Sequence, residues 1–241
     1  METEVRLNPA LYIASNVSNN FMTGFRYIFL ITFILQISLV ANCQETQIDS
    51  TILNIDTATI DGVKYKAIYK TNKYFFILNS KEDTVFKSKN YFRFFEFTDF
   101  DNDNRKDLIF SYISNIPIKD LILYDSKNKV FVPVENFSKF PEPIKIKGTK
   151  FYYSFHHSGC ADKNWDSDLF YIDNFKAIIL GNISGRECDN MDVKDDIYIY
   201  KIKENKKSLI KSLSIDMIHK FKDDKWGFIE DFWTKNYKEF E

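Results

Sequence analysis

The residues best placed to do chemistry are four aspartates in a short acidic loop, residues 99–107. Asp99, Asp101, Asp103 and Asp107 occupy positions 1, 3, 5 and 9 of this loop. Carboxylates this close repel one another unless a cation lies among them. A hard divalent ion that takes about six to eight oxygens, such as Ca²⁺, suits alternate aspartate side chains plus a backbone carbonyl. The loop is therefore a candidate calcium site, and the alternative is a solvated turn rich in Asp and Asn without an ion.

The residues in and around the acidic loop distinguish it from an EF-hand. An EF-hand loop is closed by a glutamate at its twelfth position and turns at a glycine at its sixth. This loop has Phe110 and Asn104 at those positions. Asn104 still allows the turn, because Asn is the residue next to Gly in its tolerance of positive φ. The aromatic and apolar residues on both sides of the loop favour flanking strands rather than helices.

The loop resembles the D-x-D-x-D-G-x-x-D-L loop of FG-GAP/VCBS-type repeats, which joins two β-strands in integrin-like propeller blades. Asn104 replaces the glycine of that pattern. The resemblance implies one Ca²⁺ site whose ligands are a backbone carbonyl and four carboxylates, namely the carbonyl of Arg105 and the side chains of Asp99, Asp101, Asp103 and Asp107.

The composition describes a folded, sheet-rich chain. Its 241 residues are 44% hydrophobic and 28% charged, which is enough apolar material to build a core. Aromatic residues make up 17% of the chain, with 24 Phe and 14 Tyr, and such residues favour strands. The net charge of −1 gives no electrostatic basis for binding nucleic acid, so we expect no nucleic-acid partner.

An apolar run near the N-terminus predicts export. Tyr27–Val40 is predominantly apolar, follows Arg26 and precedes a small residue, which is the order of a secretory signal peptide. The run is shorter than the ~20 residues of a transmembrane helix, although residues 27–44 carry no charge, so an uncleaved membrane segment is the alternative. Met22 is a natural start because a compact positive segment follows it, and residues 1–21 are then an upstream extension.

Cys43 stands where a bacterial lipoprotein carries its acylated cysteine. Asn42 departs from the Gly, Ala or Ser usual just before that cysteine, so a lipoprotein and a plainly cleaved secreted protein are both open. Full acylation would anchor the chain stably, whereas a single lipid chain holds weakly. We expect residues 1–43 to be extension plus signal peptide and residues 44–241 to be one β-rich domain. The expected location is the periplasm, or the outer membrane or cell surface as a lipoprotein.

The remaining cysteines are consistent with export. Cys160 and Cys188 are an even pair once Cys43 is acylated or removed, and such pairs form disulfides in oxidising compartments. The alternative is two buried free thiols. We expect the disulfide.

Alternating apolar and polar residues predict β-strands through most of residues 44–241. Val63–Lys70 repeats with period two and has one apolar face and one lysine face. Many short strands joined by short turns favour a mainly β fold, an antiparallel meander arranged as a propeller-like or sandwich-like sheet. Residues 224–240 break this pattern, because aromatic residues recur there at helical spacing. They predict one C-terminal amphipathic helix that covers a sheet, with recruitment of a partner as the alternative.

A second oxygen-rich stretch precedes an expected strand at residues 169–172. Asp162, Asn164, Asp166 and Asp168 repeat the alternate spacing, but Phe170 occupies the ninth position. We therefore expect a polar turn here, with a weaker second metal loop as the alternative.

Two adjacent histidines, His156 and His157, raise the hypothesis of a metal-dependent hydrolase. Adjacent side chains on a strand point to opposite faces, so the pair cannot easily share one ion. The sequence contains no G-x-S-x-G, H-E-x-x-H or glycine-rich phosphate loop. We expect that the protein is not an enzyme.

From Phe94 to Ser154 the order of acidic loop, strand and hairpin resembles a group of bacterial envelope lipoproteins with a calcium-binding, β-propeller-like domain. Some members inhibit lysozyme-type glycosidases and act as immunity proteins. The first functional hypothesis is a non-catalytic, calcium-binding envelope protein that binds a protein or a glycan. The second, from the resemblance, is a periplasmic glycosidase inhibitor or immunity lipoprotein, and the third is a metal-dependent hydrolase. Membrane contact is expected only through a lipid anchor or an uncleaved signal segment.

Overall fold

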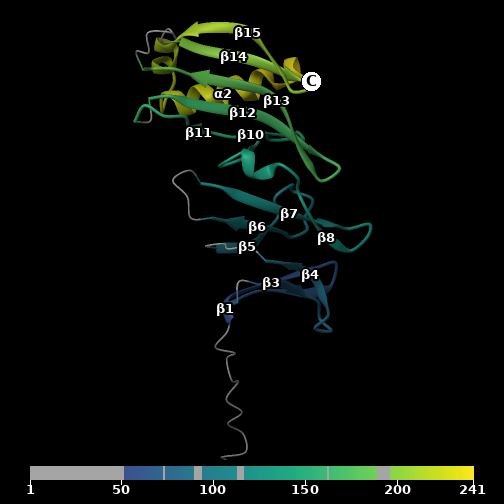
Figure 1. Ribbon diagram of the computed structural model, residues 1–241. Coiled ribbons are helices and arrows are strands. Elements are labelled where there is room, and N and C mark those ends of the chain that lie inside the picture. Colours follow the sequence, from purple (N-terminus) through teal and green to yellow (C-terminus); the bar gives the residue numbers. More distant parts are fainter. Residues whose placement is uncertain (1–51, 73, 90–93, 113–116, 162, 189–195) are drawn as a thin grey trace, which may run out of the picture. The chain divides into compact units, whose positions relative to one another are not determined.

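A computed structural model of the chain describes residues 52–241 apart from residues 73, 90–93, 113–116, 162 and 189–195 (Figure 1). These residues belong to one compact unit that begins at Ser50. The expected extension and signal segment, with Met22 and Cys43, lie outside the described residues. No helix in the described part of the chain is long and apolar enough to cross a membrane.

The first sheet holds four antiparallel strands in the order β1-β2-β3-β4. Its strands are β1 (Ile52–Ile60), β2 (Val63–Lys70), β3 (Phe75–Leu78) and β4 (Thr84–Ser88). Asp61 and Gly62 form the β1–β2 turn, and both have positive φ, 48° and 79°. A two-residue hairpin turn of this kind matches the twist of its strands, and Asp-Gly is one of the pairs that adopts it most easily.

The second sheet repeats this arrangement with strands in the order β5-β6-β7-β8. They are β5 (Phe94–Thr98), β6 (Asp107–Ser111), β7 (Lys119–Asp125) and β8 (Val130–Pro133). The acidic loop joins β5 to β6. A 3₁₀ turn, η1 (Phe137–Lys139), follows β8.

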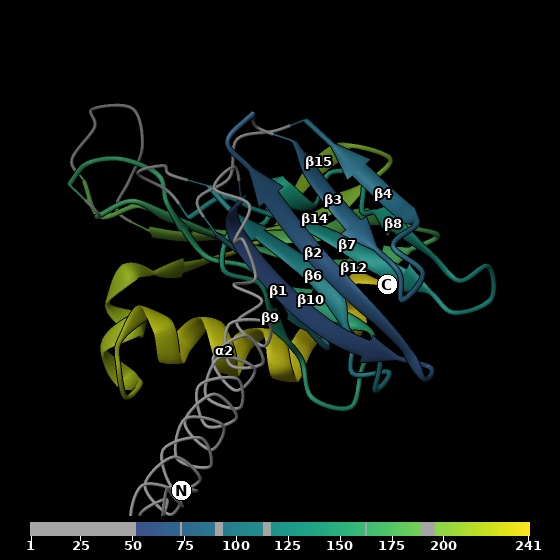
Figure 2. The same ribbon diagram turned by 90° about the horizontal axis from the view of Figure 1, so that it is seen from below.

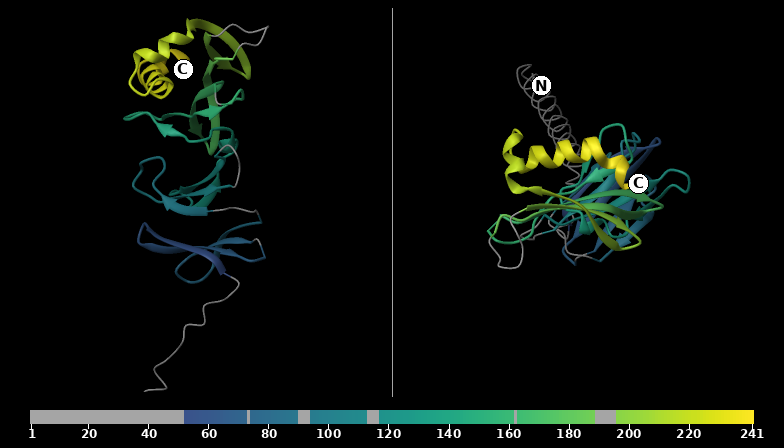
Figure 3. Two further views of the ribbon diagram at one scale, coloured as in Figure 1. Left: turned by 90° about the vertical axis from the view of Figure 1, so that its left-hand side faces the viewer. Right: turned by 90° about the horizontal axis from the view of Figure 1, so that it is seen from above.

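The third sheet is the largest, with seven strands in the order β15-β14-β13-β12-β10-β9 and β11 paired to β12. Its strands are β9 (Ile144–Lys145), β10 (Phe151–Tyr153), β11 (His156–His157), β12 (Trp165–Asp173), β13 (Lys176–Gly185), β14 (Asp196–Lys203) and β15 (Lys206–Ser214). Three helical segments end the chain: η2 (Ile215–Lys220), α2 (Lys225–Asn236) and η3 (Tyr237–Phe240). Figure 3 shows α2 along one face of this sheet.

Three hydrophobic clusters hold these elements together. Phe75 of β3 packs edge-on against Phe95 and Phe110, which joins the first sheet to the second with ring centroids 5.1 and 4.9 Å apart. Phe140 stacks on Phe170 at 4.1 Å in the cluster that joins the second sheet to the third. The third cluster lies between the third sheet and α2, and contains two fully buried tryptophans, Trp165 and Trp233. Aromatic burial of this extent is the main source of stability in such a core.

The predicted fold class is confirmed, since the described chain is mostly antiparallel sheet with a C-terminal helix. The expected helix over residues 224–240 corresponds to α2 and its 3₁₀ extension η3. Phe228, Ile229 and Trp233 of α2 are buried against the third sheet. The expected disulfide is also present, between Cys160 and Cys188.

One expected turn is wrong. Asp166 and Asp168 lie inside β12, which starts at Trp165 rather than at the expected Leu169. Trp165 and Leu169 alternate with the two aspartates, so the apolar side chains face α2 while the aspartates occupy the other face of the sheet. Acidic residues are typical of turns, but Asn182 of β13 and Arg186 just after β13 bind these two within the sheet.

Candidate metal centre

Two adjacent, paired strands give the acidic loop its shape. Thr98 of β5 lies opposite Asp107 of β6, so residues 99–106 leave one strand and return to the next. Asn102 and Asn104 adopt positive φ of 60° and 67°. Short polar side chains tolerate this conformation, which is why Asn104 can stand where the FG-GAP pattern has glycine.

Backbone amides of the loop donate to its own carboxylates. Asp99 accepts hydrogen bonds from the amides of Asp103 and Asn104, both at 3.1 Å. Asp101 accepts from the amide of Asp103 at 3.2 Å, and Asp103 accepts from the amide of Arg105 at 2.8 Å. These bonds fix the carboxylates on the inner side of the turn.

Three of the four expected aspartates converge. Asp99, Asp101 and Asp107 each place a carboxylate oxygen within 4.8 Å of the others. Asp107 is only 2% exposed, and its two oxygens accept from the amides of Phe100, at 3.1 Å, and Tyr124, at 2.9 Å. Burial raises the pKa of Asp107 to about 7, and the negative charge of Asp101 adds to this while the amide of Tyr124 opposes it. Burial, and then the charge of Asp103, also raise the pKa of Asp101.

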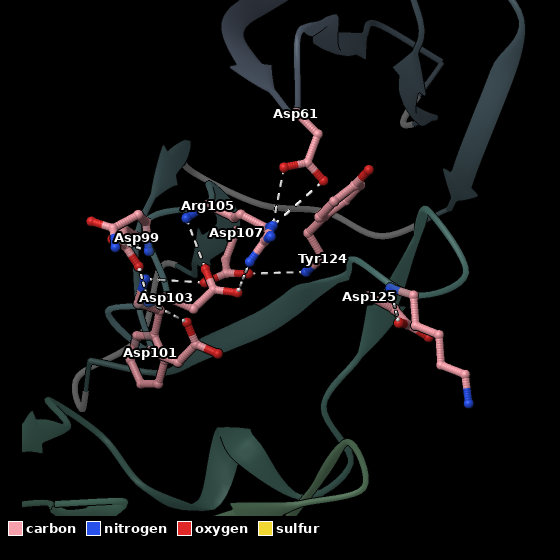
Figure 4. A network of polar contacts seen from close by, with 11 residues as sticks. Asp61, Asp99, Asp101, Asp103, Arg105, Asp107, Tyr124 and Asp125 are labelled. Carbon is pink, nitrogen blue, oxygen red and sulfur yellow. Dashed lines mark hydrogen bonds and ion pairs between the residues drawn. The ribbon is translucent and has the colours of Figure 1, made fainter.

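Asp103 lies in an ion pair rather than in this group. Its carboxylate is 3.2 Å from Nη1 of Arg105, and Nε of Arg105 is 3.1 Å from the carboxylate of Asp61 (Figure 4). The structure therefore brings together Asp99, Asp101 and Asp107. The expected ligand roles of Asp103 and of the Arg105 carbonyl stay predictions.

The chemistry of the converging groups fits Ca²⁺. All three are carboxylates, which are hard oxygen donors of the kind that Ca²⁺ prefers. A divalent ion among them would relieve their mutual repulsion and would favour the ionised form of the buried Asp107. Thiolate or imidazole ligands, which softer metals prefer, are missing from this group.

The acidic loop contacts all three sheets. Arg105 binds Asp61 in the β1–β2 turn of the first sheet. Asp107 begins β6 in the second sheet and binds the amide of Tyr124 in β7. Phe100 stacks on Tyr152 of β10 in the third sheet, with centroids 4.9 Å apart and planes 10° apart.

A further bond ties the loop to the third sheet, where Lys145 of β9 donates to the backbone carbonyl of Asp101. Sequence reasoning missed Asp61, Phe100, Lys145 and Tyr152. The one signal that points to any of them is an aromatic residue, Phe100, between two aspartates of an otherwise polar loop.

The second metal candidate does not assemble in the described residues. Asp162 lies outside them. Asp166 pairs with Arg186 at 3.1 Å, and Asp168 accepts from the side-chain amide of Asn182 at 2.7 Å. Burial raises the pKa of Asp168 to about 6, although the bond from Asn182 opposes this rise.

The side-chain oxygen of Asn164, the remaining member, accepts from the amide of Glu187. Within the described residues, the one set of three or more Asp, Glu, His or Cys side chains whose ligand atoms converge is the group in the acidic loop. The positions of Asn164, Asp166 and Asp168 therefore give no support to the weaker alternative, a second metal loop.

The two adjacent histidines lie on opposite faces of the third sheet, as expected. In β11, His156 is opposite Asp166 and His157 is opposite Trp165, whose side chain belongs to the cluster under α2. The ring of His157 packs against Phe155 at 5.1 Å. The two rings cannot bind one ion in this arrangement.

Comparisons with known proteins identify two solved structures of low sequence identity. No protein-family model and no curated protein matches the sequence. A solved structure described as a Xanthomonas type IV secretion system related protein matches with a TM-score of 0.41 and 13% identity, over 64% of this chain and 92% of that chain. The Dos1 propeller matches with a TM-score of 0.29 and 14% identity, over 68% of this chain and 48% of that chain.

Proposed function

We propose that this chain is a non-catalytic, calcium-binding protein exported to the cell envelope, where its β domain binds a protein or a glycan. The proposal is carried by the convergence of Asp99, Asp101 and the buried Asp107 within 4.8 Å of one another. Three carboxylates this close, one of them 2% exposed, are unfavourable without a cation and are a suitable donor set for Ca²⁺ with one.

The contacts of the acidic loop support a structural role for the ion. The loop binds Asp61 in the first sheet, Tyr124 in the second and Tyr152 in the third. Ordering the loop would therefore order three sheets relative to one another. A binding surface built on such a scaffold loses less conformational entropy when its partner binds.

The cysteines and the N-terminal sequence support export. The structure contains a Cys160–Cys188 disulfide. Disulfides form and persist in oxidising compartments and are rare in cytosolic proteins. The apolar run Tyr27–Val40 has the order of a signal peptide. Calcium sites of extracellular modules bind at about 10⁻⁴–10⁻³ M, so an exported site of this kind would need millimolar Ca²⁺ to fill.

Thermal unfolding of residues 44–241 with the disulfide intact tests the calcium site. Residues 52–241 include all the described strands and the three hydrophobic clusters. Calcium at a few millimolar is expected to stabilise this domain by about 1–2 kcal/mol relative to chelator, or roughly 3–6 °C in midpoint. The double variant Asp99→Asn/Asp101→Asn should lose this difference.

Asp125→Asn is the matched control. Asp125 is also a turn aspartate of the second sheet, and it accepts from the amides of Lys127 and Asn128. This variant should keep the full response to calcium. Equal midpoints for the wild type in calcium and in chelator would reduce the acidic loop to a polar turn and remove the proposal's support.

A second candidate, the glycosidase inhibitor, is favoured by one observation. The acidic loop, β6 and the β7–β8 hairpin, whose order carries the resemblance to inhibitory envelope lipoproteins, all belong to one sheet. An inhibitor should block a muramidase stoichiometrically in a titration with residues 44–241, whereas a general binding domain should not. A hydrolase would instead turn over its substrate and lose activity on substitution of His156 or Asp166.

A further inference from the structure

One face of the first sheet points away from the second sheet and takes no part in the proposed calcium site. Tyr65, Ala67 and Tyr69 of β2 point toward the second sheet and belong to the cluster between the two sheets. Side chains on a strand alternate, so Lys64, Lys66, Ile68 and Lys70 point the other way. Figure 2 views the domain from the side of this first sheet.

Cross-strand pairing extends this outward face over all four strands. Ile68 lies between Ile55 of β1 and Phe76 of β3, and Phe76 lies opposite Lys87 of β4. We call this surface the lysine face, and its main residues are Ile55, Lys64, Lys66, Lys70, Phe76 and Lys87. Ile68 lies among them and is only 5% exposed.

The lysine face is basic. Four lysines occupy its outward strand positions, and the other described positions that the pairing assigns to it are apolar or threonine. Glu82 of the β3–β4 turn approaches this face, 3.2 Å from Lys66. Lys87 lies over the rings of Tyr74 and Phe76, 4.6 and 5.5 Å from their centroids, so its stem covers apolar surface while its amine carries the charge.

Large apolar side chains flank these lysines at the β1 edge. Leu53 and Ile55 are 61% and 47% exposed. Both stand at the start of the described chain, and Leu53 lies where the register of β1 and β2 shifts. Exposed apolar side chains beside lysines are the combination that binds the interface of an anionic membrane.

We propose that the lysine face docks on an anionic phospholipid surface. A second copy of this chain is the poorer occupant, because it would place lysines against lysines. Ile52 follows Cys43 by nine residues, which span at most about 30 Å when extended, so an anchor at Cys43 would hold the first sheet close to the membrane. The proposal rests on the envelope location proposed above, and it adds direct lipid contact to the expected anchor.

Sedimentation with lipid vesicles tests this proposal. Residues 44–241, which lack the apolar run, are mixed with vesicles of phosphatidylcholine alone or with added phosphatidylglycerol. Binding is expected only to the anionic vesicles and should weaken as salt rises. Each lysine near an anionic surface contributes about fivefold to partitioning, so the triple variant Lys64→Glu/Lys66→Glu/Lys87→Glu should lose on the order of a hundredfold.

The matched control has the same change in net charge on the third sheet. Lys203, Lys206 and Lys211 are exposed on β14 and β15, and their triple replacement by Glu should leave vesicle binding within a few-fold of wild type. Thermal midpoints of all three proteins show that each is folded. Equal loss in both triple variants, or equal binding to neutral and anionic vesicles, would overturn the proposal.

Two further arms separate competing explanations. Sedimentation equilibrium without lipid tests for a dimer. A wild-type dimer that the Lys64→Glu/Lys66→Glu/Lys87→Glu variant loses would identify a second copy as the occupant and would overturn lipid docking. Vesicle binding should persist in chelator at a temperature where the protein is folded. Vesicle binding without a calcium response in thermal unfolding would refute the calcium proposal alone. A calcium response without vesicle binding would refute lipid docking alone.

Discussion

Replacing Asp107 by Asn should stabilise the domain in chelator, and calcium should close most of this difference. Asp107 is 2% exposed and close to two other carboxylates, so its charge is unfavourable unless an ion neutralises it. In chelator, the neutral Asn removes that unfavourable charge. In calcium, it removes one of the proposed ligands.

The magnitude follows from the pKa of the buried carboxyl. Burial raises the pKa of Asp107 from 3.8 to about 7. Between about pH 4 and pH 7 the folded chain holds a proton on Asp107 that the unfolded chain has lost. The free energy of unfolding therefore falls as pH rises through this range, by about 4 kcal/mol in total. Asn offers a single acceptor oxygen to the two amides of Phe100 and Tyr124, which costs about 1–2 kcal/mol. Near pH 8 in chelator, the free energy of unfolding of the Asp107→Asn variant should therefore exceed that of the wild type by about 2–3 kcal/mol.

Urea unfolding at about pH 5 and pH 8 measures this prediction, first in chelator and then in millimolar calcium. The difference between variant and wild type isolates Asp107 from other groups that titrate in this range, such as Asp168. Asp125→Asn is the control, because hydrogen bonds from Asn128 lower the pKa of Asp125 rather than raising it. The control should show no gain near pH 8.

Calcium should narrow the gap in the free energy of unfolding between variant and wild type near pH 8 by about 1–2 kcal/mol, because only the wild type keeps all three converging carboxylates. A variant that is no more stable than wild type in chelator near pH 8 would refute the buried-charge reasoning. An equal calcium response in both proteins would show that Asp107 does not contribute to an ion site.

Three further substitutions probe the fold around the site, each by urea unfolding. Phe100→Ala removes the stack on Tyr152 and should cost about 2–3 kcal/mol; a cost below about 0.5 kcal/mol would mean that the loop does not support the third sheet. Cys160→Ser/Cys188→Ser opens a disulfide with a sequence separation of 28 and should cost about 3–4 kcal/mol, and unchanged stability would contradict the chain-entropy estimate. Gly185→Ala would place a Cβ 2.0 Å from a buried tryptophan ring and should cost at least about 1–3 kcal/mol, whereas a neutral result would show that the ring has room to move.

The fold class could be predicted from the sequence because it depends on local pattern. The period-two alternation of Val63–Lys70 predicts a strand with one buried face, and β2 has that pattern. The C-terminal helix was recognisable for the same reason, since its buried residues recur at helical spacing. The expected turn at Asp166 and Asp168 is wrong because these side chains are satisfied within a strand by Asn182 and Arg186, which lie 14 and 20 residues further along the chain.

The candidate site was predictable in part. The spacing of Asp99, Asp101 and Asp107 in one short loop is local, and the structure brings them together. The ion pair that holds the Asp103 side chain depends on Arg105, which also reaches Asp61 across 44 residues. Contacts of that range are set by how the sheets pack, and no local pattern in the sequence encodes them.

Calorimetric titration of residues 44–241 with Ca²⁺ most directly tests the central claim that the acidic loop binds calcium. We predict a single site at about 10⁻⁴–10⁻³ M or tighter, lost in Asp99→Asn/Asp101→Asn and kept in Asp125→Asn. The claim would be contradicted if the wild type showed no heat of calcium binding, or if the double variant bound calcium as the wild type does.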